Sequence, residues 1–257
     1  MRPGVLLTLL ALAGATLAGG CGGGDSDRPE LLVAAAADMQ FAFPEIGALF
    51  EEECDCSVTL SFGSSGNLTE QIKAGLPADV FAAANIDYAD ELREVGLVID
   101  ETQQLYALGR IVLAVNRDSG LSVSDLDDLR SPEVKRIALA NPEHAPYGIA
   151  AMEALQSVGL WEELKPKLVY AENVRQAMQY VRSGDAPVGL IALSVADVPE
   201  ITYVLIDESL HEPIRQAIAV LRRTQHEELA REFIAFVNGP QGRPIMKKYG
   251  FLLPGEF

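Results

Sequence analysis

The chain has 257 residues, of which 49% are hydrophobic and 22% charged, and its formal net charge at pH 7 is -17. So negative a chain argues against a nucleic-acid-binding protein, because it would repel the phosphate backbone. It also argues against a broad basic surface that attracts anions, so a bound anion would have to be held by local dipoles.

Residues 1–20 have the layout of an export signal. Arg2 precedes an apolar run at 5–17, and small residues follow it. The run is too short to span a bilayer and matches the three-part secretory pattern. The letters Ala-Gly-Gly-Cys that end at Cys21 resemble a lipoprotein cleavage box, with alanine where leucine is commoner. We predict that the signal is removed, that Cys21 is lipidated and that 21–29 is a flexible tether, with ordinary signal cleavage nearby as the alternative.

Cysteine use agrees with export and predicts no metal site. Besides Cys21 the chain has Cys54 and Cys56, and a disulfide between these two would close a very small, strained ring. We expect 54–56 to be the turn between a helix and a strand, and the state of the two cysteines stays open. No protein-bound metal is expected, because the three histidines are scattered without ligand spacing (His144, His211 and His226).

Strands and helices alternate through the first half of the chain that remains. Strands are predicted where apolar residues run together or alternate, and helices where apolar residues recur every three or four positions. The predicted strands are 31–36, 57–61, a short strand that ends at 83, and 110–115; the predicted helices run through 41–50, from the turn at 63–66 to 74, and through 87–95.

The second half repeats this alternation. Helices are predicted at 126–129, 149–158, 174–181 and 227–237, and strands at 136–140, 168–170, 187–193, 201–206 and 214–221. Strands that alternate with helices predict parallel α/β sheets. The chain thus forms two short α/β halves and returns to the first of them near its end, which predicts two lobes.

The stretch 59–68 contains the end of a strand, a Ser/Gly turn and the first turn of a helix. A helix that begins there leaves backbone N–H groups unpaired at its positive end, beside the hydroxyls of Ser64 and Ser65. Such groups form a cradle for an anion. Ser and Gly before a helix are also ordinary capping residues, so this motif alone does not establish a site.

The same stretch of sequence does not match either of two catalytic motifs. A phosphate-binding P-loop ends in Lys followed by Ser or Thr, where this chain has Asn67 and Leu68. A nucleophile elbow needs Gly-x-Ser-x-Gly, and the Gly-Ser-Ser-Gly of 63–66 is one residue too short.

Parallel sheets bind ligands beyond the carboxyl ends of their strands. In this chain those positions contain few Lys or Arg residues and few groups arranged for catalysis. At three of them a helix begins. The positions are 37–38, 63–66, Asn85, 141–148, 171–174 and 193–194.

Several motifs follow one another in the order seen in the periplasmic molybdate-binding proteins of ABC importers. They are 34–38, 61–66, 71–81, 141–148, 173–174 and 248–251. The chain resembles this family from residue 31 to residue 253. The resemblance implies an α/β, type II periplasmic binding fold, with two α/β lobes joined by two crossover segments and the ligand in the cleft. On this basis lobe 1 comprises 30–106 and 212–257, and lobe 2 comprises 107–211.

The resemblance also implies how the ligand is held. In the family, backbone N–H groups and hydroxyls bind a tetrahedral oxyanion without a positive side chain. Ser65 matches a binding serine, with Ser64 beside it in the same motif. Tyr147 and Val174 match positions that offer their backbone N–H groups, and Asp38 matches the family's other binding serine.

Asp38 departs from the family pattern. A carboxylate about 4 Å from a negative ligand costs roughly 4 kcal/mol at an effective dielectric constant near 20. We expect the side chain to turn away and cap its own helix, so that the backbone N–H of Asp38 or Met39 faces the ligand. The alternative is that Asp38 accepts a proton from a protonated oxyanion such as hydrogen phosphate. A tyrosine donor of several relatives aligns near Ala192, so Ser194 or Tyr147 would have to replace its hydroxyl.

We therefore expect a non-enzymatic, exported, monomeric protein without a cofactor. It would capture molybdate or tungstate, in the periplasm or anchored through Cys21 outside the cytoplasmic membrane. It would deliver the anion to an ABC permease driven by a cytoplasmic ATPase. Sulfate, thiosulfate or phosphate are alternative ligands. A secreted hydrolase with Ser64 or Ser65 as nucleophile and His144 as base is a second alternative, although His144 is expected to pin its loop by hydrogen bonds.

Overall fold

The computed structural model describes residues 28–257. The predicted signal, Cys21 and most of the predicted tether lie outside the described residues. Within 28–257, none of the helices combines the length and the apolar character needed to cross a membrane.

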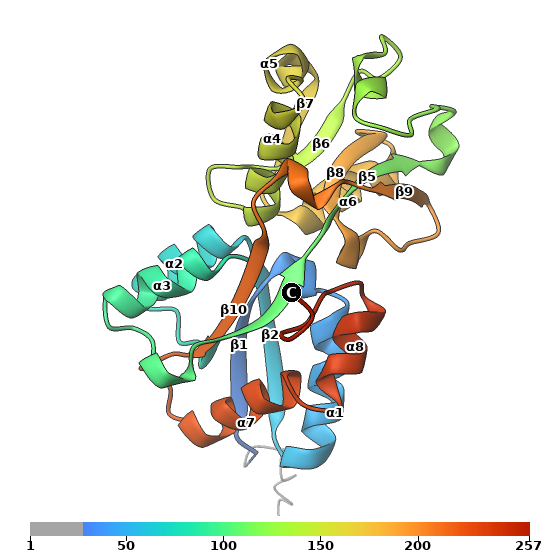
Figure 1. Ribbon diagram of the computed structural model, residues 1–257. Coiled ribbons are helices and arrows are strands. Elements are labelled where there is room, and N and C mark those ends of the chain that lie inside the picture. Colours follow the sequence, from blue (N-terminus) through green and yellow to red (C-terminus); the bar gives the residue numbers. More distant parts are fainter. Residues whose placement is uncertain (1–27) are drawn as a thin grey trace, which may run out of the picture.

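The chain folds into two lobes, each built on a five-stranded sheet (Figure 1). The first sheet has the order β2-β1-β3-β10-β4, with β1 at Glu30–Ala36, β2 at Ser57–Gly63, β3 at Val80–Ala83, β4 at Gln104–Gly109 and β10 at Ile214–Val220. The second has the order β7-β6-β8-β5-β9, with β5 at Ile111–Asn116, β6 at Ile137–Ala140, β7 at Leu168–Ala171, β8 at Val188–Ala192 and β9 at Ile201–Leu205. This is the predicted two-lobed, type II periplasmic binding fold.

Both sheets are mixed, so the prediction of parallel sheets was wrong for two strands. β1 pairs in parallel with β2 and β3, and β6 with β7 and β8. In contrast, β10 is antiparallel to β3 and β4, and β5 is antiparallel to β8 and β9. β5 and β10 are the strands that enter a lobe from the other one. They start beside the crossover and run away from it, whereas the strands next to them run towards it.

The chain crosses between the sheets twice. Arg110 alone separates β4 from β5, and residues 206–213 connect β9 to β10. The C-terminal segment lies beside the first crossover, where Leu252 forms a β-bridge with Leu108 and the Arg110 side chain donates to the Gly250 carbonyl. The predicted lobe limits at 106/107 and 211/212 stay predictions.

Helices cover both faces of the first sheet. α1 (Ala42–Cys54), α7 (Glu227–Val237) and α8 (Gly242–Lys248) lie on one face, and α2 (Ser65–Lys73) and α3 (Ile86–Glu94) on the other (Figure 1). Because side chains alternate along β1, Val33 packs with the first group and Ala34 with the second. Phe233 is fully buried in the first group, where its ring centroid lies 5.9 Å from that of Phe43 and 5.3 Å from that of Phe50.

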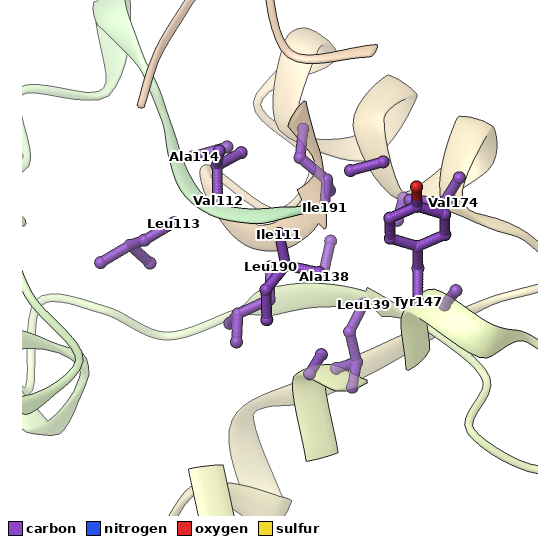
Figure 2. Packing of buried hydrophobic residues seen from close by; sticks show 14 of the residues in the cluster. Ile111, Val112, Leu113, Ala114, Ala138, Leu139, Tyr147, Val174, Leu190 and Ile191 are labelled. Atoms are coloured by element: carbon purple, nitrogen blue, oxygen red, sulfur yellow. The ribbon is translucent and has the colours of Figure 1, made fainter. Parts of the chain in front are cut away.

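The second lobe has one continuous core. α4 (Pro146–Ser157) and α6 (Val174–Ser183) pack on β6 and β8, and the short α5 (Trp161–Leu164) packs on α4. Ile111, Leu139 and Leu190 form the middle of this core, and Tyr147 and Val174 lie at one edge of it (Figure 2). That edge faces the first lobe.

Three of the strands and α-helices, and one covalent bond, were not predicted. β4, α5 and α8 were missed, and the helix expected at 126–129 is a 3-10 turn, Asp127–Arg130. Cys54 and Cys56 form a disulfide, against the argument from ring strain. Asp55 between them adopts a left-handed backbone with φ 48°, and the two Cα atoms lie 5.2 Å apart, within the range that a disulfide spans.

Candidate anion-binding site

A small cavity lies between the lobes, beyond the carboxyl ends of β1, β2, β3, β6 and β7. All five residues predicted to bind the oxyanion lie on its wall: Asp38, Ser64, Ser65, Tyr147 and Val174. The remaining wall consists of Ala36, Ala37, Gly63, Ala84, Ala145, Pro146 and Asn173. Residues from both sheets therefore meet at one point, as expected from the positions where the strands end.

Local sequence explains why three helices begin at this cavity. The Ser64 hydroxyl caps α2 by accepting from the Asn67 N–H at 3.4 Å, and the Asn173 side chain caps α6 by accepting from the Gln176 N–H at 3.0 Å. α4 begins with Pro146, whose missing N–H and restricted φ suit the first helical position. Ser64, Pro146 and Asn173 thus each mark the start of a helix, and the three helix N-termini lie on one cavity wall.

The backbone N–H groups of Ser65, Tyr147 and Val174 belong to the first turns of these helices. Such groups have no partner within their own helix, and within residues 28–257 no other backbone carbonyl accepts from them. Each helix also brings the positive end of its dipole to the cavity. The wall thus offers several free donors to a negative group.

Two hydroxyls add to these donors. Ser65 is fully buried, and its Oγ accepts from the Ala84 N–H at 2.9 Å, which leaves the hydroxyl hydrogen for a ligand. The Ser64 Oγ lies 2.8 Å from Nδ1 of His144. When Nδ1 carries a proton, it donates to Ser64, and the Ser64 hydrogen is then also free to point into the cavity.

Positive side chains are absent from this wall. Among the described residues that line it there is no lysine or arginine, and the ionisable ones are Asp38 and Tyr147. A negative ligand would therefore be stabilised by N–H groups, hydroxyls and helix dipoles. The strongly acidic composition does not prevent this, because the effect of a helix dipole is confined to its first turn.

Asp38 belongs to a buried hydrogen-bonded cluster at the edge of the cavity. Its Oδ2 accepts from the Tyr147 hydroxyl at 2.9 Å and from Nε2 of Gln216 at 2.7 Å, and the same Nε2 donates to the Tyr147 oxygen at 2.9 Å. The Ser194 hydroxyl donates to the Asp38 carbonyl at 2.9 Å. Since Asp38 and Gln216 come from the first lobe and Tyr147 and Ser194 from the second, the cluster ties the lobes together.

This cluster corrects two expectations. Asp38 lies in a 3-10 helix, η1 (Ala37–Met39), and its side chain makes no capping hydrogen bond. The hydroxyls of Tyr147 and Ser194 both donate to Asp38, so neither replaces the tyrosine donor of the relatives. The physical reason is burial: the Asp38 side chain is only 1% exposed, and a buried carboxylate requires donors from the protein.

Burial also changes the ionisation of the cluster. It raises the pKa of the Asp38 carboxyl from 3.8 to about 6, against the hydrogen bonds from Gln216 and Tyr147, which act in the opposite direction. Burial and the neighbouring Asp38 raise the pKa of the Tyr147 and Tyr106 hydroxyls, so both stay protonated. The second carboxylate oxygen of Asp38, Oδ1, is buried and has no hydrogen-bond partner within residues 28–257.

A second set of contacts joins the lobes around His144. The Gly66 N–H donates to the His144 carbonyl at 3.0 Å, and the Asn67 side chain donates to Glu172 Oε1 at 3.2 Å. At position 66 a Cβ atom would lie 2.8 Å from the His144 carbonyl oxygen, so this approach requires glycine. His144 holds its loop against Ser64 by hydrogen bonds, as expected, and does not line the cavity.

Sequence analysis missed Gln216 and Gly109. A Cβ atom on Gly109 would overlap the Tyr147 hydroxyl and lie 2.9 Å from Nε2 of Gln216, so the cluster requires a glycine there. Gln216 could have been noticed as a polar residue in an otherwise apolar strand, but its contact with Asp38 joins residues 178 positions apart.

One candidate position lies elsewhere: Asn85 caps α3 and is not on the cavity wall.

Comparison with known proteins identifies the family. The profile of the family described as "Bacterial extracellular solute-binding protein" matches residues 31–252. The molybdate-binding protein ModA of Rhodobacter capsulatus is 33% identical over 87% of this chain and 88% of its own length. The putative ABC transporter substrate-binding lipoprotein YvgL of Bacillus subtilis is 30% identical over 95% of this chain and 96% of its own.

A solved structure agrees with these sequence matches. The periplasmic molybdate-binding protein of Azotobacter vinelandii superposes with a TM-score of 0.82 at 29% identity, covering 87% of this chain and 99% of that chain. The fold, the profile and the identity over most of both chains point the same way. The chain therefore belongs to the bacterial extracellular solute-binding proteins, among relatives of the ModA type.

Proposed function

We propose that this protein captures a tetrahedral oxyanion, molybdate or tungstate, in the cavity between its lobes and delivers it to an ABC importer. The observation that carries this proposal is the convergence of three helix N-termini and two serine hydroxyls on a wall without a positive side chain. Relatives over nearly the whole chain are molybdate-binding proteins, which supports the choice of ligand.

The wall suits an anion whose charge is spread over several oxygens. The N–H groups of Ser65, Tyr147 and Val174 come from both lobes, so they can reach different oxygens of one ligand. The hydroxyls of Ser64 and Ser65 supply further donors. Each contact is a charge-assisted hydrogen bond, which is stronger than one between neutral groups.

Ligand binding would act through the position of the lobes. An anion that accepts from both lobes at once favours the closed state over an open one, and only this difference in affinity can shift the equilibrium. The two crossovers, at Arg110 and at residues 206–213, are the connections about which such a closure would turn. The loaded, monomeric protein would then dock on a permease driven by a cytoplasmic ATPase. It would work in the periplasm, free or tethered through a lipid on Cys21.

Thermal unfolding with added anions tests this function. Molybdate at about a thousand times its dissociation constant should stabilise the protein by roughly 4 kcal/mol, which for a chain of this size is a shift of about 8 to 16 °C. Tungstate should act alike, and sulfate, thiosulfate and phosphate should shift the transition much less. Ser65→Ala should reduce the molybdate shift, whereas the matched variant Ser183→Ala, at the far end of α6, should keep it. A shift with sulfate or phosphate alone would refute the named ligand.

One observation favours a hydrolase as the second candidate. Ser64 Oγ and His144 Nδ1 lie 2.8 Å apart, as a nucleophile and its general base would. Among the described residues, however, no carboxylate accepts from the His144 ring to orient it, and the Ser64 hydroxyl already caps α2. Turnover of carboxylic or phosphate esters that Ser64→Ala abolishes would establish the hydrolase. Absence of turnover in a protein that binds molybdate would remove it.

A further inference from the structure

The hydrogen atoms of the Asp38 cluster can be counted. The Tyr147 hydroxyl has one hydrogen, which it donates to Oδ2 of Asp38. The Gln216 Nε2 group has two, one donated to the same Oδ2 and one to the Tyr147 oxygen. Oδ2 therefore receives two hydrogen bonds and is a poor place for a further proton, while Oδ1 receives none from the protein.

Oδ1 belongs to a side chain that lines the cavity and is almost fully buried. A buried polar atom without a partner is rare, because its lost hydration is not replaced. A bound oxyanion would be the missing partner, but two negative groups cannot satisfy each other without a hydrogen between them. Either the ligand brings that hydrogen or Asp38 does.

We propose that Asp38 binds the dianion as a neutral acid, with a proton on Oδ1 that it donates to a ligand oxygen, so that the protein takes up one proton with each dianion. This inference rests on the proposed function, because molybdate is a dianion without a proton of its own near neutral pH. The balance is simple: the carboxylate form of the protein, one dianion and one proton from solvent give the loaded protein with Asp38 protonated.

The surroundings of Asp38 favour its neutral form once a dianion is bound. Among the ionisable side chains on the elements around it, Tyr106 of β4 and Tyr147 of α4 interact with Asp38. The others are Glu153 of α4, Arg175, Tyr180 and Arg182 of α6, Arg215 of β10, and Arg110, His144 and Glu172 beside these elements. The two tyrosines remain neutral because burial raises their pKa. Glu172, Arg175, Arg182 and Arg215 are exposed, and the Arg110 guanidinium donates to the Gly250 carbonyl. No ion pair in the described chain includes Asp38, and no positive group influences its pKa. No positive group thus compensates a buried carboxylate beside a dianion.

The pKa of the free protein sets the size of the effect. In the free protein the pKa of Asp38 is about 6, because the effect of burial exceeds that of the hydrogen bonds that lower it, and a dianion in contact raises the pKa further because like charges repel. Above pH 6 the dissociation constant for molybdate should then rise, by about 50-fold between pH 6 and pH 8. At pH 7 about 0.9 of a proton should be taken up for each molybdate bound.

Titration calorimetry of the full-length mature protein with sodium molybdate tests this directly. Measurements at pH 7 in buffers of different ionisation enthalpy give the number of protons taken up, and measurements from pH 6 to pH 8 give the change in affinity. In Asp38→Asn, the side-chain amide can donate where the acid did, so affinity should no longer depend on pH and proton uptake should vanish. Asp185→Asn, an exposed change just beyond the C-terminal end of α6, and His144→Asn should both keep the pH dependence.

Each outcome decides between these ideas. Proton uptake near one, lost in Asp38→Asn only, supports the inference, and the wild-type measurement alone suffices if that variant does not fold. Molybdate binding with a constant affinity and no proton uptake would overturn the inference while the proposed function stands. The same holds if Asp38→Asn keeps the pH dependence. Binding of hydrogen phosphate but not of molybdate at any pH would overturn both, since the ligand would then supply the proton.

Discussion

Replacing Asp38 by asparagine should raise the free energy of unfolding of the ligand-free protein at neutral pH. Burial raises the pKa of the Asp38 carboxyl from 3.8 to about 6, because the charged form loses its hydration. A carboxyl with a higher pKa in the folded state binds more protons when folded, so the folded state loses stability as pH rises through this interval. The loss of stability is absent below the lower pKa of 3.8 and complete above the higher pKa of about 6.

The two pKa values set the magnitude. Their difference corresponds to about 3 kcal/mol at pH 7 and to less than about 1 kcal/mol at pH 4. Asparagine has the same shape as aspartate, carries no charge and can still accept from Tyr147 and Gln216. The variant should therefore gain up to about 3 kcal/mol relative to wild type at pH 7, a rise of about 6 to 12 °C in the unfolding temperature.

Thermal unfolding followed by circular dichroism at pH 4 and pH 7, without added anion, measures this gain. The quantity to compare is the gain in stability at pH 7 minus the gain at pH 4. Any effect of asparagine on packing is the same at both pH values and cancels in this difference. Asp185→Asn, whose side chain is exposed, should show no such difference. A gain for Asp38→Asn that is equal at both pH values, or larger at pH 4, would refute the assignment of a buried, costly carboxylate.

Three further changes test other parts of the argument. Tyr147→Phe removes a donor that lowers the pKa of Asp38, so the midpoint of the pH dependence of molybdate affinity should move to higher pH in calorimetric titrations. Gly109→Ala forces a methyl group against the Tyr147 hydroxyl and the Gln216 amide; denaturant unfolding should show a loss of about 1 to 3 kcal/mol, and an unchanged stability would contradict the packing of this cluster. Phe233→Ala leaves a cavity in the core of the first lobe and should cost about 3 to 5 kcal/mol in the same assay, with the molybdate affinity of the remaining folded protein unchanged.

Local signals were sufficient where a feature depends on a few neighbouring residues. The capping residue Ser64 and the period of Leu68 and Ile72 predicted the start of α2, and the pattern after Asn173 predicted a helix from Val174, where α6 begins. Apolar runs located most strands, because a buried strand needs side chains that pack on both faces. Since strands that end at one sheet edge bring their following residues together, the cavity wall could also be anticipated.

Features that depend on contacts between distant residues were not readable in this way. The reversed direction of β5 and β10 follows from the crossings between lobes, which no local pattern records. The disulfide between Cys54 and Cys56 depends on the left-handed backbone of Asp55, which outweighed the argument from ring size.

Short stretches of sequence were enough to predict helix starts with unpaired backbone N–H groups and nearby hydroxyls, because these starts are encoded within a few residues of each strand end. The contacts of Asp38, in contrast, depend on the fold of the whole chain. Its neighbours Tyr147 and Gln216 come from an α-helix of the other lobe and from a strand near the end of the chain. Burial among these residues, which depends on the fold as a whole, sets both the orientation of the carboxylate and its pKa.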